Sequence, residues 1–223
     1  MTTILLINPN TSARSTDMMV SVAQPLLPAG VSIVGTSATR GPAMILDEDT
    51  LADAAAEVVR IGTERAKDCA AIIVAAFGNP GASRLREILA IPVVGIGEAA
   101  IRDAACGGRR FGIVTTTPNL VRSIQAAVRD LGLAGSYTGV RVPAGDPLAF
   151  AANPTAQDAA LAEAASACIE IDGAEAVVIG GGPLSDTAAR LRTRFTNAIV
   201  EPVPAAIQAL MRQLAKPKVL AAL

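Results

Sequence analysis

Residues 70–81 read AAIIVAAFGNPG, and residues 176–185 read AVVIGGGPLS. In both segments an apolar run typical of a buried strand leads directly into a glycine-rich turn. A strand that ends in such a turn before a helix exposes backbone N–H groups, and these groups can bind an anionic or carbonyl oxygen. Because the two segments lie about half a chain apart, they predict two similar lobes that face one shared site.

Three more pairs of segments repeat in the same order and at a similar offset. The matched pairs are 4–12 with 111–119, 31–36 with 137–143, and the Pro-Val segments 91–93 with 201–203. The first pair joins a strand-like run to a polar turn rich in helix-capping residues. A duplicated α/β lobe explains this pattern, although any α/β chain alternates strands and helices and supplies some matches by itself.

Continuous apolar runs such as 71–74 and 177–179 are typical of parallel strands covered on both faces. Ala-rich helices are predicted over 11–27, 49–67, 80–89, 119–131, 156–172 and 204–214. The fold class is therefore α/β with two pseudo-symmetric lobes, each a mostly parallel sheet flanked by helices. Residues 1–100 and 201–223 are assigned to the first lobe and residues 101–200 to the second. Ligands of parallel sheets bind outside the carboxyl ends of the strands, so the active site is expected in the cleft between the lobes.

Composition narrows the function classes. The 223 residues carry a net charge of −1, and 51% of them are apolar. A basic block that would bind nucleic acid is absent, as are an apolar stretch long enough to span a membrane and a signal-like N-terminus. A cytoplasmic protein with a small-molecule substrate is expected.

Histidine is absent, and the three cysteines, at 69, 106 and 168, lack the spacing of metal ligands. The cysteines are interpreted as small apolar residues of the core. Neither a metal nor a cofactor is expected, and Cys–His nucleophilic catalysis is disfavoured.

Four motifs together resemble those of the aspartate/glutamate/hydantoin racemase superfamily, in particular its hydantoin and allantoin racemase branch. They are INPNTS at 7–12, FGNPG at 77–81, PVVGIGEA at 92–99 and DGAEA at 172–176. The resemblance covers the chain from Ile4 to about Leu210. It implies a cofactor-independent enzyme, usually a homo-oligomer, with a small-molecule cleft between two lobes.

The resemblance also implies two cysteines, one per lobe, that act as acid and base on opposite faces of the substrate's α-carbon. The matching positions in this sequence are Ala76 and Gly181, and neither can transfer a proton. Three explanations compete: natural divergence to another reaction, a cysteine-free variant made to trap substrate, or a binding protein that has lost its chemistry. Engineered sites would more often carry Ala or Ser at both positions, so Gly181 favours divergence.

The remaining polar turns predict a binding apparatus for a carboxylate or carbonyl group, built from short side-chain donors and backbone N–H groups. The candidate substrate-binding residues are Asn8, Ser12, Phe77, Gly78, Asn79, Thr116, Thr117, Gly181, Gly182 and Pro183. Taken singly, Asn8 and Ser12 could equally cap a helix, and the threonines could end a strand. As a group they favour binding.

Candidate catalytic residues are fewer. Asp47 and Glu48 follow a segment that lies near the cleft in the family, and either could instead be a capping or solvated carboxylate. Tyr137, the one tyrosine, could donate a proton or could pack within a strand. Asp186 follows the second glycine turn and could equally belong to the first turn of a helix.

The sequence keeps the candidate oxyanion donors but lacks the two thiols. This combination suits a reaction at a carbonyl group better than proton exchange on both faces of a carbon atom. The first expectation is therefore ring-opening hydrolysis of a small cyclic ureide or amide by a carboxylate-activated water. The alternatives are a hydantoin or allantoin racemase-type isomerase that uses another base, a lyase or decarboxylase, and a non-catalytic metabolite-binding protein. The hydrolase, isomerase and lyase reactions all stay open at this point.

Overall fold

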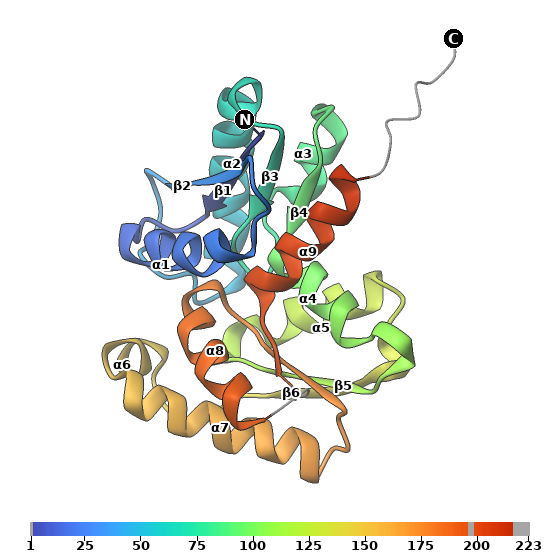
Figure 1. The fold of residues 1–223 in the computed structure, drawn as a ribbon. Helices are drawn as coiled ribbons and strands as arrows, with labels where there is room; N and C mark the ends of the chain where they lie inside the picture. The colour runs from blue at the N-terminus through green and yellow to red at the C-terminus, as the bar shows by residue number, and fades with distance from the viewer. Residues whose placement is uncertain (1, 196–198, 216–223) are drawn as a thin grey trace.

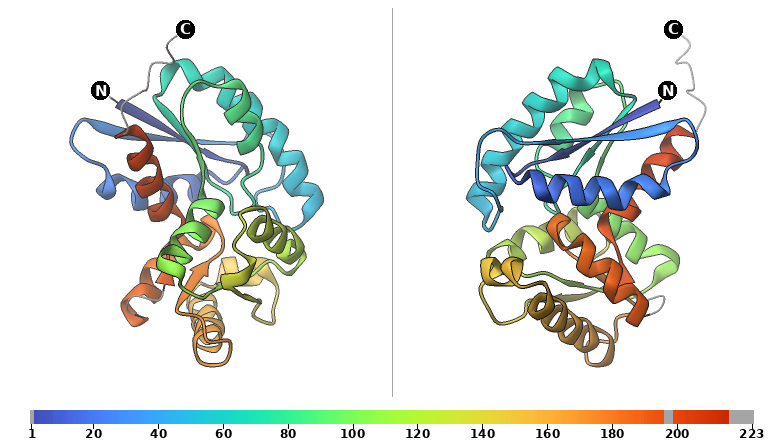
Figure 2. Two further views of the ribbon diagram at one scale, coloured as in Figure 1. Left: turned by 90° about the vertical axis from the view of Figure 1, so that its right-hand side faces the viewer. Right: turned by 60° about the vertical axis from the view of Figure 1, so that its left-hand side comes forward.

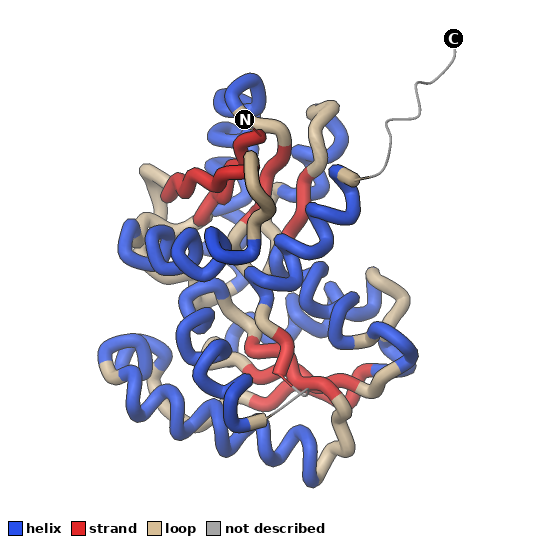
Figure 3. The backbone as a smooth tube through the Cα atoms, viewed as in Figure 1, coloured by secondary structure: helices blue, strands red, loops and turns tan. Residues whose placement is uncertain are grey.

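The computed structural model describes residues 2–195 and 199–215 and contains two four-stranded parallel sheets with helices on both faces (Figure 1). Figure 3 shows the strands at the centre of each lobe with the helices outside them. The predicted α/β fold with two lobes is confirmed. Within the described residues, none of the helices is long and apolar enough to cross a membrane.

The first sheet has the strand order β2-β1-β3-β4. Its strands are β1 (Thr2–Asn8), β2 (Val31–Ser37), β3 (Ala71–Val74) and β4 (Val93–Gly95). Alternate residues of a strand face opposite sides of a sheet. Accordingly, Ile4 and Leu6 of β1 join one core cluster, and Leu5 and Ile7 join another. The first face is covered by α1 (Ala13–Ala23) and α9 (Pro202–Leu214), and the second by α2 (Glu48–Arg65) and α3 (Ala82–Ile88).

The second sheet repeats this plan with the order β6-β5-β7-β8. Its strands are β5 (Phe111–Val114), β6 (Tyr137–Arg141), β7 (Ala176–Ile179) and β8 (Ile199–Val200). One face packs on α4 (Ile96–Ala104) and α5 (Val121–Asp130), and the other on α7 (Pro154–Glu170), with α8 (Ser185–Arg194) beside β8 (Figure 2). A single core cluster contains β1 and β5 residues together with the buried side chains of α4 and α9, so the lobes share one core.

The predicted match of 91–93 with 201–203 is shifted in position. Val93 starts β4, which leads into α4, whereas Pro202 starts α9 directly after the short strand β8. Proline is favoured in the first turn of a helix, where its missing N–H costs no hydrogen bond. The helix α6 (Pro147–Ala152) was not predicted. The lobe boundaries at 100/101 and 200/201 stay a prediction, since α4 packs against both α9 and β7.

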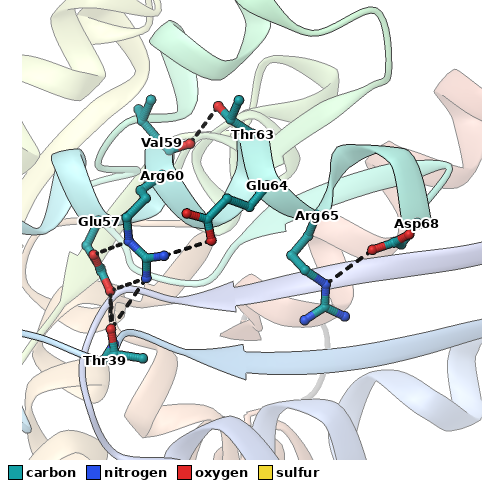
Figure 4. A network of polar contacts seen from close by, with 8 residues as sticks. All are labelled: Thr39, Glu57, Val59, Arg60, Thr63, Glu64, Arg65 and Asp68. Carbon is teal, nitrogen blue, oxygen red and sulfur yellow. Dashed lines mark hydrogen bonds and ion pairs between the residues drawn. The ribbon is translucent and has the colours of Figure 1, made fainter.

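The loop that follows β2 is fastened to α2 by a buried carboxylate (Figure 4). Glu57 Oε1 accepts hydrogen bonds from Thr39 N at 3.1 Å and Thr39 Oγ1 at 2.7 Å, and Arg60 donates to both carboxylate oxygens. The hydrogen bonds from Arg60 and Thr39 outweigh the effect of burial and hold the pKa of Glu57 far below its ordinary range. This loop also carries Met44 and Ile45, which line the cavity described below.

We expect Glu57→Gln to lower the unfolding free energy by about 2 kcal/mol at neutral pH, because the charged hydrogen bonds to a buried carboxylate are lost. A carboxylate whose pKa is depressed in the folded state stabilises the fold fully above its unfolded pKa, and this contribution is lost as the pH falls through the folded value. The difference between wild type and variant should therefore be smaller at about pH 3.5. Urea titrations followed by circular dichroism measure both values.

Glu64→Gln is the matched control, because Glu64 Oε2 binds the same arginine at 2.7 Å but its side chain is 58% exposed. Exposed ion pairs contribute little, so this variant should lose less than about 0.5 kcal/mol. Equal losses in the two variants would mean that burial of Glu57 does not strengthen its contacts.

Candidate functional site

A cavity of about 440 Å³ lies between the lobes, at the carboxyl ends of the strands. It is lined by residues from all four polar turns, namely Asn10 and Ser12 after β1, Ala76–Gly78 after β3, Thr115–Thr117 after β5 and Gly180–Pro183 after β7. Its position follows from the topology, because parallel strands present their carboxyl ends at one edge of each sheet.

Both positions that match the family's cysteines, Ala76 and Gly181, line this cavity. The three cysteines of the chain do not line it. Cys168 is buried in the second lobe, where burial raises the pKa of its thiol to about 11, and Cys69 lies at the start of the turn before β3. The cavity therefore has no thiol to accept or deliver a proton.

The turn after β3 offers backbone donors. The N–H groups of Ala76, Phe77 and Gly78 form no hydrogen bond with any residue that the structure describes. Asn79 holds this turn in place: its side-chain Oδ1 accepts hydrogen bonds from Gly97 N at 2.9 Å and Glu98 N at 3.3 Å, which caps α4. Asn79 itself does not line the cavity, so its place is in the frame of the site.

The two asparagines at the end of β1 and in the turn after it have different roles. Asn8, expected to bind substrate, is fully buried, and its Nδ2 donates to Asn10 Oδ1 at 2.8 Å and to Thr16 Oγ1 at 2.9 Å. Asn10 lines the cavity and is 5% exposed. Asn10 Oδ1 also accepts from Ser12 N, whereas Asn10 Nδ2 forms no hydrogen bond with the described residues and can donate to a ligand. The sequence analysis did not name Asn10 as a site residue; Asn10 lies in the turn beyond the end of β1.

Hydroxyl groups from both lobes face the same space. Ser12 caps α1, and its Oγ lies 3.0 Å from Ser15 Oγ. Thr117 Oγ1 lies 2.9 Å from Thr115 Oγ1. Thr116 is 6% exposed, lines the cavity and forms no hydrogen bond with the described residues. A hydroxyl at the cavity wall that has no partner among the described residues is a ready donor to a ligand oxygen.

Three charged side chains line the cavity: Arg14 of α1, and Asp186 and Arg190 of α8. Arg190 is paired outside it, with Nη2 at 2.8 Å from Asp158 Oδ1. That pair is the main reason that the pKa of Asp158 is lowered. Arg14 and Asp186 form no ion pair within the described part of the chain. Among the described lining residues, Asp186 is the one carboxylate, and none is a lysine, histidine, cysteine or tyrosine.

Asp47 and Glu48, expected to act as bases, do not reach this cavity. Asp47 caps α2 by accepting from Thr50 N at 2.8 Å, and its hydrogen bonds from Thr50 lower its pKa. Glu48 accepts from Ser123 Oγ at 3.1 Å. Both line a separate surface hollow of about 380 Å³ with Asn119 and Arg122. Asp47 therefore caps a helix, which was the alternative to a catalytic role in the sequence analysis.

Tyr137, the third catalytic candidate, also lies away from the cavity. Its ring packs on Phe111 with the centroids 5.5 Å apart, and its buried hydroxyl has no hydrogen-bond partner among the described residues. Burial is the main reason that its pKa is raised to about 12. This is the strand-packing role that was weighed against proton donation.

An apolar wall completes the cavity. It is contributed by Met18, Met44, Ile45, Leu51, Leu120, Ile124, Leu148 and Leu184. Leu148 of α6 is 54% exposed, so its contribution to the fold is small and its side chain is available to a ligand. The cavity can therefore hold a small molecule with polar atoms on one side and apolar atoms on another.

The arrangement offers oxyanion donors from both lobes and one carboxylate, which suits proton transfer next to a carbonyl group. Groups of three or more Cys, Asp or Glu side chains placed to hold a metal ion do not occur in the ranges 2–195 and 199–215.

Comparisons with known proteins agree with this geometry. A hydantoin racemase from Paenarthrobacter aurescens is 32% identical over 209 residues, which cover 91% of this chain and 87% of that protein. Allantoin racemase from Klebsiella pneumoniae superposes with a TM-score of 0.90 at 26% identity, covering 96% of this chain and 88% of that one. Allantoin racemase from Pseudomonas fluorescens superposes with a TM-score of 0.86 at 26% identity, and the match covers 99% of this chain and 99% of that one. With a match to the Asp/Glu/hydantoin racemase model over residues 4–210, the chain belongs to that family.

Proposed function

We propose that this chain is an isomerase-type enzyme that exchanges the α-proton of a small cyclic ureide in the interlobe cavity, with Asp186 as its single base. The carrying observation is that Asp186 is the one proton-accepting side chain among the described residues lining the cavity. The similarity to hydantoin and allantoin racemases supports a ureide substrate.

In this proposal a ring carbonyl next to the α-carbon accepts hydrogen bonds from the free N–H groups of residues 76–78, assisted by Asn10 and Thr116. The Asp186 carboxylate takes the α-proton, so the C–H bond breaks, an O–H bond forms, and the electron pair moves into the enolate. The hydrogen bonds stabilise the enolate oxygen. Asp186 then returns a proton to the carbon. If Asp186 has exchanged its proton with D₂O before this step, the α-carbon receives deuterium.

A single base differs from a pair of thiols in its stereochemical result. Asp186 delivers the new proton to the face from which it removed the old one, so exchange with retention should exceed inversion. The sequence first suggested ring-opening hydrolysis with Asp47 or Glu48 as the base that activates water. Both residues lie outside the cavity, so neither supports that reaction. Hydrolysis, decarboxylation and binding without turnover are outcomes that the same assay separates. Cytoplasmic location and homo-oligomeric assembly stay predictions.

Proton NMR in D₂O with enantiopure hydantoins and allantoin tests the proposal at neutral pH, with enzyme-free samples as blanks. We expect deuterium at the α-carbon in an otherwise intact ring, appearing faster than optical rotation is lost. A ring-opened or decarboxylated product would contradict the proposal. If none of the compounds reacts but some of them raise the melting temperature of the protein, the chain is a binding protein.

Asp186→Asn should lower the exchange rate by about 100-fold or more, the usual contribution of a positioned general base. Asp49→Asn is the matched control, since Asp49 also lies in the first turn of a helix but outside the cavity. It should retain wild-type exchange. If instead the rate falls in Asp47→Asn or Glu48→Gln and not in Asp186→Asn, the base has been assigned to the wrong carboxylate.

A further inference from the structure

Arg14 is a cation at the cavity that forms no ion pair with the residues that the structure describes. It lies in the first turn of α1, lines the cavity, and is exposed. No described carboxylate lies within ion-pair distance of it, and Asp17, three residues further along α1, is not bonded to it. The guanidinium of Arg14 is therefore not held in a direct ion pair and can bind an anion at the cavity.

The position of Arg14 also has no rationale in helix stability. The positive end of the helix dipole lies at the N-terminus, where a cation is disfavoured and an acidic residue is favoured. The first turn of α1 contains no acidic residue, and the N-cap is already supplied by Ser12, whose side chain accepts from Ser15 N. Arg14 thus adds positive charge where the helix would be better without it, which is understandable if a ligand supplies the anion.

The charges of the cavity indicate how much negative charge a ligand would carry. Arg190 is neutralised by Asp158, whose oxygens bind its Nε and Nη2 atoms. Asp186 adds one negative charge to the lining, and Arg14 adds one positive charge. Among the described lining residues, a dianion such as a phosphate ester would meet one cation without an ion pair beside one carboxylate, whereas a single carboxylate matches Arg14 and suits the fork of a guanidinium.

Arg14 and Met18 lie one turn apart on α1 and line the same cavity. A ring held by the buried donors Asn10 and Thr116 would direct a substituent along this helix face toward the exposed guanidinium. We infer that Arg14 is a specificity-determining residue that binds a carboxylate on the substituent, so that the substrate is a cyclic ureide with an acidic side chain. This inference rests on the proposed function, because it assumes a ureide ring in the cavity.

The test compares a carboxyethyl-substituted hydantoin with its propyl-substituted counterpart, which has nearly the same size but no charge. With wild type, KM for the acidic compound should be lower by about 3- to 5-fold, the effect of one exposed charge pair. Arg14→Gln should raise KM for the acidic compound by about the same factor at nearly constant kcat, as expected when binding to substrate and transition state is lost equally. Arg14→Lys should restore part of the preference.

Arg129→Gln removes another exposed arginine, on α5 and outside the cavity, and should keep the wild-type KM ratio between the two compounds. Added NaCl should narrow the ratio in wild type, because an exposed pair is screened by salt. Equal KM values for both compounds in wild type, or an equal change for both in Arg14→Gln, would overturn the inference.

The inference and the proposed function can fail separately. If neither compound exchanges its α-proton, the proposed function fails, and calorimetric binding of the carboxyethyl compound to wild type and Arg14→Gln still tests the arginine. Loss of that binding in the variant supports the role of Arg14, and unchanged binding refutes it. If both compounds exchange equally well, the proposed function stands and the acidic substituent is excluded.

Discussion

Gly97→Ala is expected to destabilise the protein by about 3–5 kcal/mol, although alanine is the better helix former and Gly97 lies in α4. A Cβ atom at this position would overlap the carbonyl oxygen of Phe77, and backbone atoms cannot move aside as a flexible side chain can. The same substitution would displace Asn79 Nδ2, 3.1 Å from that Cβ. The turn after β3 would shift together with its free N–H groups.

Urea unfolding followed by far-UV circular dichroism measures this loss. Gly135→Ala is the matched control, because a Cβ atom there meets nothing within 4 Å. It should change the unfolding free energy by less than about 0.5 kcal/mol. If Gly97→Ala proves as stable as Gly135→Ala, the close approach of α4 to the turn after β3 does not exist in solution.

The double variant Ala76→Cys/Gly181→Cys is expected to racemise an enantiopure substrate at least about 100-fold faster than the parent chain does. The reason is that the two thiols supply an acid and a base, one on each lobe. Position 76 already carries a Cβ atom. At Gly181 the backbone is extended, and a Cβ atom would meet only Leu184 side-chain atoms, at 3.2 Å, which can give way by a few tenths of an ångström. Both thiols therefore fit the existing frame.

The stereochemical course is the diagnostic readout for this variant. Two opposed thiols should bring the rate of optical-rotation loss close to the rate of deuterium incorporation, whereas the parent should incorporate deuterium faster. Ala76→Ser/Gly181→Ser has nearly the same shape without thiols and should behave as the parent does. A folded double-cysteine variant with no gain in racemisation would show that more than the thiols separates this cavity from a racemase.

The sequence predicted the frame of the protein better than its site. Apolar runs such as 71–74 identified the strands, because residues buried on both faces of a parallel sheet are apolar throughout. The cleft followed from where those strands end. A polar residue in a turn, however, can bond to its own backbone or to a ligand, and the sequence does not distinguish the two. Asn8 and Asp47 bond within the frame, and Asn10 is left open to the cavity.

The sequence analysis left the role of Asp186 open and did not name Arg14, for a different reason. Arg14 and Asp186 occupy first turns of helices, where a charge is usually explained by solvent or by the helix dipole. Their common cavity is created by the approach of α1 to α8, which are separated by most of the chain. A local sequence pattern does not reveal such a contact, so only the folded structure places both side chains at one cavity.

The return of α9 to the first lobe has a consequence for the order in which the protein can be made. Val203, Ile207 and Leu210 of α9 are fully or almost fully buried against the cluster that contains Ile4 and Leu6. A ribosome releases the chain from its N-terminus, so the first sheet emerges long before the helix that covers it. Until residues 202–214 follow, α1 covers only part of that face, and the apolar side chains that pack on α9 in the folded protein stay exposed in the nascent first lobe.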